Sequence, residues 1–110
     1  MQRILRYTVA DLCADPEGVA AALTHACRQA SGPYRVRGLV QVEDQLYVPL
    51  LPSQGAPLET YQFAPLLDCT SDEVIALLNE RWAAGFDSLA SVMAGDGLCL
   101  VLLARPEGPA

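Results

Sequence analysis

The chain has 110 residues, of which 52% are hydrophobic and 18% charged, and its formal net charge is −6. This composition predicts one globular domain over residues 1–110, and the acidic balance disfavours a nucleic-acid partner, whose phosphates would be repelled. Lysine is absent, which excludes chemistry based on a Schiff-base or phosphate-loop lysine. The sequence contains no run of about 18 apolar residues, so no membrane-spanning segment is expected.

The first half of the chain has the pattern strand, helix, strand, strand. Alternating apolar and polar residues predict a strand over residues 3–9. Asp15, Pro16 and Glu17 are typical of a helix start, with an N-cap carboxylate and a proline at the first helical position. The helical stripe ends at Ala30, and strands are expected over residues 34–42 and 46–51.

The second half repeats this order. A strand is expected over residues 60–66, where Pro65 indicates an early end or an edge position. Residues 70–73 (Thr-Ser-Asp-Glu) form a capping box that predicts a second helix, closed at Gly85. Two strands, 86–93 and 98–105, then form a hairpin.

The two halves also share a sequence pattern. Residues 44–51 (Asp-Gln-Leu-Tyr-Val-Pro-Leu-Leu) recur 52 positions later as residues 96–103 (Asp-Gly-Leu-Cys-Leu-Val-Leu-Leu). A period of about fifty residues is typical of a duplicated supersecondary unit. We therefore expect pseudo-repeats at residues 1–52 and 58–106, joined by a linker at residues 53–57.

Six strands and two helices predict an α+β two-layer sandwich, in which two tandem βαββ repeats form one sheet with both helices on one face. Strands 46–51 and 98–103 are apolar on both faces, as in strands that meet no water. Two helices cannot cover both faces of six strands. We therefore expect a homodimer through the helix-free face.

The second half resembles a family of small, functionally uncharacterised bacterial strand–helix–strand–strand domains. In that family the helix ends in Gly-Trp-Glu-Leu-Val, and the last strand ends in a basic residue often followed by proline. The corresponding stretches here are residues 85–89 (Gly-Phe-Asp-Ser-Leu) and 102–106 (Leu-Leu-Ala-Arg-Pro). Phe86 stands where that family has tryptophan. The resemblance implies a fold and no known activity.

The length and element order are also similar to those of two-repeat members of the tautomerase superfamily. Those enzymes act through a proline that is exposed when the initiator methionine is removed. Gln2 occupies that position here, so the catalytic residue is missing and the activity is not expected.

Metal and cofactor sites are not expected. The four cysteines contain no C-x-x-C pair and are expected to be reduced, as in a cytoplasmic protein. His25 is the single histidine, and its neighbour Cys27 points elsewhere on the helix, so the two cannot chelate a metal. The paired acids lie at a turn and a helix start, and we predict no catalytic residue set.

Arginines are the strongest candidates for binding. Arg81 falls within the apolar stripe of the second helix, where it either extends to solvent or binds an anion. Strand alternation places Arg6, Arg35 and Arg37 on one sheet face, and Asp87 lies 52 positions after Arg35. These charges either face solvent or complement each other across a dimer.

The leading hypothesis is a small cytoplasmic module that self-associates and binds a protein or a small acidic ligand, with no nucleic-acid or membrane partner. The alternative is a small cofactor-free enzyme of tautomerase-like or ferredoxin-like build. In that enzyme, Arg81, Tyr61 and Tyr47 would surround a pocket. A closed apolar cavity in which Arg81 and a tyrosine converge would favour the enzyme, whereas a filled core would favour the module.

Overall fold

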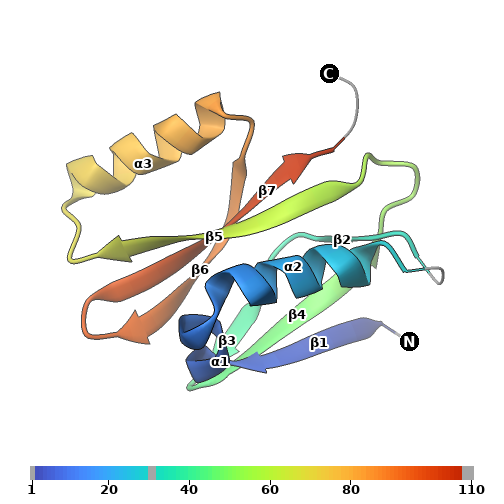
Figure 1. The fold of residues 1–110 in the computed structure, drawn as a ribbon, viewed down its shortest axis with the longest axis horizontal. Helices are drawn as coiled ribbons and strands as arrows, with labels where there is room; N and C mark the ends of the chain where they lie inside the picture. The colour runs from blue at the N-terminus through green and yellow to red at the C-terminus, as the bar shows by residue number, and fades with distance from the viewer. Residues whose placement is uncertain (1, 30–31, 108–110) are drawn as a thin grey trace.

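The computed structural model describes residues 2–29 and 32–107. It shows an α+β fold with three helices and two antiparallel sheets (Figure 1). In chain order the elements are β1 (Arg3–Thr8), α1 (Val9–Ala14), α2 (Pro16–Cys27), β2 (Tyr34–Val36), β3 (Val40–Val42), β4 (Gln45–Pro52), β5 (Glu59–Leu67), α3 (Ser71–Ala83), β6 (Asp87–Gly95) and β7 (Leu98–Pro106).

The predicted helix starts are confirmed. Asp15 caps α2 by accepting a hydrogen bond from the Gly18 amide at 3.0 Å, and Pro16 is the first helical residue. Thr70 and Glu73 form the expected capping box at α3. Gly85 follows this helix with a φ of +92°, a conformation that favours glycine.

Two local predictions need correction. The first strand ends at Thr8, because Thr8 and Asp11 form a capping box that starts the unpredicted helix α1. This helix buries Leu12 completely. The strand expected over residues 34–42 is interrupted at residues 37–39, so it forms two short strands, β2 and β3, which pair with different parts of β4.

The prediction of a single sheet is wrong. In sheet A, the central strand β4 pairs with β1 on one edge and with β2 and β3 on the other, whereas sheet B has the order β5-β7-β6. Each central strand is thus paired on both edges within its own half of the chain, which leaves no edge of β4 or β7 for the other half. Both halves share one strand order, while their origin by duplication stays a prediction.

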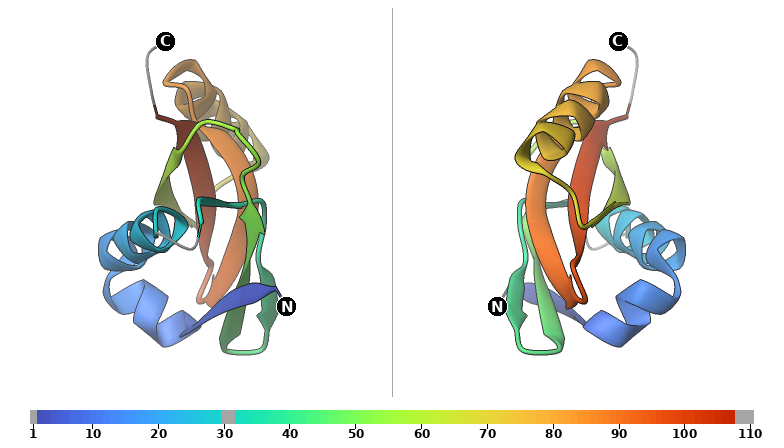
Figure 2. Two further views of the ribbon diagram at one scale, coloured as in Figure 1. Left: turned by 90° about the vertical axis from the view of Figure 1, so that its right-hand side faces the viewer. Right: turned by 90° about the vertical axis from the view of Figure 1, so that its left-hand side faces the viewer.

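The two sheets pack face to face instead of joining at their edges. Their inner faces form the core, in which Leu46, Val48 and Leu50 of β4 meet Leu100 and Leu102 of β7. Helix α2 closes one side of this sandwich and packs beside β5. Figure 2 shows the sheets from both ends, with α2 at the side and α3 outside sheet B.

The expected placement of both helices on one face is also wrong. Helix α3 packs on the outer face of sheet B, against Val101 and Leu103, whereas α2 closes the side of the core that the two sheets form. Strand β7 is therefore buried on both faces within one chain, by sheet A and by α3. For this strand, the two-sided apolar pattern does not require a second copy.

A polar junction holds the two halves together around Tyr61, whose side chain is only 6% exposed. Its hydroxyl accepts a hydrogen bond from the Val36 amide at 2.8 Å and donates one to the Glu59 carboxylate at 3.1 Å. Its own amide donates to Thr24 Oγ1 at 3.2 Å. Glu59 also pairs with Arg37. The junction thus connects α2, the end of β2 and β5.

A second polar contact holds β3 of sheet A against the free edge of β6 in sheet B. The side-chain amide of Gln41 in β3 donates to the Met93 carbonyl at 2.8 Å, and its oxygen accepts from the Met93 amide at 3.0 Å. The side chain satisfies the two backbone groups that a neighbouring strand would otherwise pair. It therefore occupies the edge of β6 at this residue.

We expect Tyr61→Phe to lower the free energy of unfolding by about 1–3 kcal/mol, because the buried Val36 amide would lose its acceptor. Urea unfolding measures this change. Tyr47→Phe is the matched control, because Tyr47 lies on the opposite face of sheet A, away from the junction, and we expect a change within about 0.5 kcal/mol. Equal stability of the two variants would contradict the role of the junction.

The junction also predicts an alkaline loss of stability. Burial raises the pKa values of the Tyr61 hydroxyl and the Cys27 thiol above their ordinary values of 10.0 and 9.0. The unfolded chain releases these protons near the ordinary values, whereas the folded chain retains them. Stability is therefore complete below pH 9 and is lost as the pH rises through and beyond 10.

Urea unfolding between pH 7 and pH 11 tests this expectation. Burial also raises the pKa of Tyr7. In Tyr61→Phe the decline above pH 10 should be shallower, because one of the retained protons is gone. A wild-type free energy of unfolding that stays constant up to pH 11 would refute the assignment.

Candidate functional site

The first candidate surface is the outer face of sheet A, the face turned away from sheet B. Register places Arg6 opposite Tyr47, and Arg35 opposite Leu51. Tyr47 and Leu51 are separated by an even number of residues on β4, so both arginines lie on this face. Arg6 and Arg35 thus lie on the same sheet face, on strands at opposite edges of β4, whereas Arg35 and Arg37 line one hollow with Leu51.

This outer face combines apolar and basic side chains. Ile4, Val40 and Val42 are 52%, 53% and 53% exposed. The buried side chains of α1 and α2 pack on the inner face of the sheet, so these helices do not cover the outer one. The strand residues of the outer face are Ile4, Arg6, Thr8, Arg35, Val40, Val42, Gln45, Tyr47, Pro49 and Leu51.

Arg37 and Asp87 are placed differently from the other predicted site residues. Arg37 lies just beyond β2, and its guanidinium pairs with Glu59 in the polar junction. Asp87 begins β6 in sheet B and is exposed. Within the described part of the chain, no ion pair joins Asp87 to an arginine.

The second candidate is a groove of about 690 Å³ between α2 and α3, with β5 between the two helices (Figure 1). It contains Arg28, Arg81 and the single histidine, His25. The Nε atom of Arg81 is buried and makes no hydrogen bond to the described residues. Its one ion pair, with Glu80, is long at 3.9 Å. Arg28 pairs with Glu107.

Tyr61 also lines this α2–α3 groove, but its hydroxyl is engaged in the polar junction. The raised pKa of this hydroxyl keeps it protonated, and its proton is donated to Glu59. Tyr47 lies on the outer face of sheet A, so the structure does not bring it together with Arg81 and Tyr61. Arg81 and Tyr61 therefore line one groove without Tyr47, and the Tyr61 hydroxyl in it is already bonded to Glu59 and to the Val36 amide.

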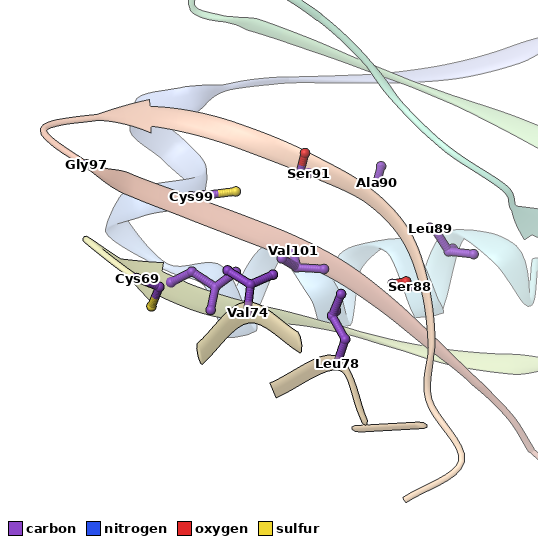
Figure 3. Close-up of a pocket in the computed structure, with 11 residues that line it drawn as sticks. Cys69, Val74, Leu78, Ser88, Leu89, Ala90, Ser91, Gly97, Cys99 and Val101 are labelled. Atoms are coloured by element: carbon purple, nitrogen blue, oxygen red, sulfur yellow. The ribbon is translucent and has the colours of Figure 1, made fainter. Parts of the chain in front are cut away.

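A third surface was not predicted from the sequence. A groove of about 490 Å³ lies between α3 and β6. Figure 3 shows Val74 and Leu78 projecting from α3 toward β7, with Ser88 and Ser91 on β6 beyond them. The groove is lined by Leu66, Cys69, Val74, Leu78, Ser88, Leu89, Ala90, Ser91, Gly97, Cys99 and Val101.

This α3–β6 groove exists because α3 covers sheet B incompletely. No side chain of α3 is fully buried. Ile75 and Trp82, seven positions apart on the same flank of the helix as Leu78, are 56% and 69% exposed. The sequence could have indicated this surface, because the apolar stripe of α3 is wider than a helix needs for packing on one sheet.

Comparisons with known proteins do not assign a family. The chain matches no family model, no curated protein and no solved structure. Across residues 2–29 and 32–107, no three His, Cys, Asp or Glu side chains group in a way that could hold a metal ion. In the same residues, no helix has the length and hydropathy needed to cross a membrane.

Proposed function

We propose that this protein is a self-associating binding module, and that the outer face of sheet A is one of its association surfaces. The observation that carries the proposal is the group of half-exposed aliphatic side chains, Ile4, Val40 and Val42, on one sheet face beside Arg6 and Arg35. Full burial of such a side chain stabilises a complex by about 1.5–3 kcal/mol. A contiguous patch of this kind is typical of an interaction surface.

Binding is favoured over catalysis by the state of the reactive groups. Burial raises the pKa values of the Tyr61 hydroxyl and the Cys27 thiol, so neither is activated as an acid or a nucleophile at neutral pH. His25 is exposed. No cysteine in the described residues forms a disulfide, which supports a reduced, cytoplasmic location within this proposal.

The proposal includes a history for the fold. We infer that the chain arose by duplication of a strand–helix–strand–strand domain of the family that its second half resembles. The repeated sequence pattern and the identical strand order of the two sheets support this inference.

Self-association is measured by light scattering or sedimentation between micromolar and millimolar concentration. We expect the wild-type protein to exceed its monomer mass of 11.8 kDa, and Val42→Lys to weaken association by at least about tenfold, because a charge would be buried in the interface. Ala83→Lys on the exposed side of α3 is the control. A wild-type monomer at every concentration would refute the proposal.

A second candidate function is binding of a small acidic ligand in the α2–α3 groove. The buried Nε of Arg81 has no partner among the described residues, and Arg28 and His25 lie in the same groove. A carboxylate or phosphate group placed there would supply the missing acceptor for Arg81; Glu17 also lines the groove, and Arg28 is paired with Glu107.

Inorganic phosphate and succinate are the probes for this groove, followed by ¹H–¹⁵N chemical shifts. We expect saturable shifts at Thr24, Gln62 and Arg81, and an affinity roughly tenfold lower in Arg81→Gln, which loses a charge-assisted hydrogen bond. Arg105→Gln is the control, because Arg105 lies over the Phe86 ring outside the groove. Equal affinity in wild type and Arg81→Gln would exclude this site.

A further inference from the structure

We infer that the outer face of sheet A in one copy of the chain binds the α3–β6 groove of another copy. The inference rests on the proposed self-association and specifies its two surfaces. Most of the exposed large apolar side chains of the described residues lie on or beside these two surfaces, Ile4, Val40, Val42 and Leu51 at the first and Ile75, Trp82 and Met93 at the second, whereas Leu67 lies at the end of β5. The contact therefore joins unlike patches.

Helix α3 covers the outer face of sheet B incompletely. Helix α3 packs against β5 and β7 through Val74 and Leu78, and the groove beside it leaves the outer face of β6 open. Met93 on this face is 63% exposed, and Trp82 stands on the facing flank of α3. Ser88 and Ser91 are small, so the surface of another sheet can approach β6 closely.

The aliphatic part of the outer face of sheet A fits such an opening. Its exposed apolar side chains are Ile4, Val40, Val42 and Leu51, and they project from three neighbouring strands. Side chains that stand perpendicular to a sheet pack well against another layer. Trp82 and Ile75 would cover them from the α3 side, as aromatic and aliphatic anchors do in the centre of interfaces.

Charge selects the unlike pairing over pairing of two identical faces. The outer face of sheet A carries Arg6 and Arg35, and none of its strand positions is acidic. Two such faces would repel each other.

Acidic residues lie at both ends of the α3–β6 groove. Asp87 precedes the lining residue Ser88 at one end. At the other end, the Asp68 carboxylate lies against Gly97, and Asp96 is the preceding turn residue. Arg105 on β7 is stacked on the Phe86 ring. Opposite charges across an interface set its orientation and speed association.

The test uses two variants that each lose one patch. Arg6→Glu/Arg35→Glu removes the basic charges of the face and keeps the groove, whereas Trp82→Ser/Asp87→Arg removes the exposed tryptophan beside the groove, reverses the charge at its end and keeps the face. We expect each variant alone to associate at least about tenfold more weakly than the wild type. Mixed at equal concentration, the two should form a 1:1 complex, because one intact face meets one intact groove.

Sedimentation and light scattering read out the result, and circular dichroism confirms that each variant is folded. Glu80→Arg on the other flank of α3 and Gln29→Glu at the end of α2 are the charge controls and should associate like the wild type. If Arg35→Glu perturbs folding, Arg6→Glu/Val42→Glu replaces it as the face variant. Association should also weaken with added salt.

The outcomes separate the inference from the proposal on which it rests. A wild-type protein that stays monomeric removes both. If the wild type associates while the groove variant associates equally well, or the mixture forms no 1:1 complex, the outer face pairs with something other than the groove, and only this inference fails.

Discussion

Strand β7 is apolar on every side chain from Leu100 to Ala104, and all five are buried. A strand of this kind needs a packed layer on each face, and a chain of this length has few elements to supply them. The structure solves this by placing sheet A on one face and α3 on the other. The separation into two sheets follows from the same requirement. If the strands of sheet A were added to the edge of sheet B, they could not also cover the face of β7.

The two halves of the chain differ in how their helices pack. Helix α2 is drawn into the space beside β5, where Thr24 and Cys27 meet Tyr61, and it buries five of its side chains. Its counterpart α3 serves as an outer layer and buries none completely. One helix thus completes the core, while the other leaves the α3–β6 groove beside it.

The polar contacts between the sheets fix their relative orientation, which apolar packing alone would not determine. Tyr61, Glu59 and Arg37 tie the start of the second half to the end of β2, and Gln41 holds β3 against the edge of β6. Each of these contacts joins the two sheets rather than strands of one sheet. Buried or partly buried hydrogen bonds of this kind select one relative placement of two layers that apolar packing would tolerate in several.

The sequence by itself determined the local structure. The caps at Asp15 and Thr70, the edge position of Pro65 in β5 and the hairpin ending in β7 follow from side-chain hydrogen bonds, missing amides and alternation over a few residues. It also placed Arg6 and Arg35 on one face, because strand alternation is a local rule. Helix α1 was not predicted from the sequence, because its six residues are too few to show a helical stripe. The capping box formed by Thr8 and Asp11 could have indicated it.

Only the tertiary structure decided which layer covers which. The apolar pattern of β7 states that both faces are buried and leaves open whether sheet A, a helix or a second copy buries them, because hydrophobic burial is not directional. The same holds for the sites. Arg81 lines the α2–α3 groove, Tyr61 enters the junction, and Val74 and Leu78 line the α3–β6 groove. Each of these places combines elements that only tertiary packing brings together.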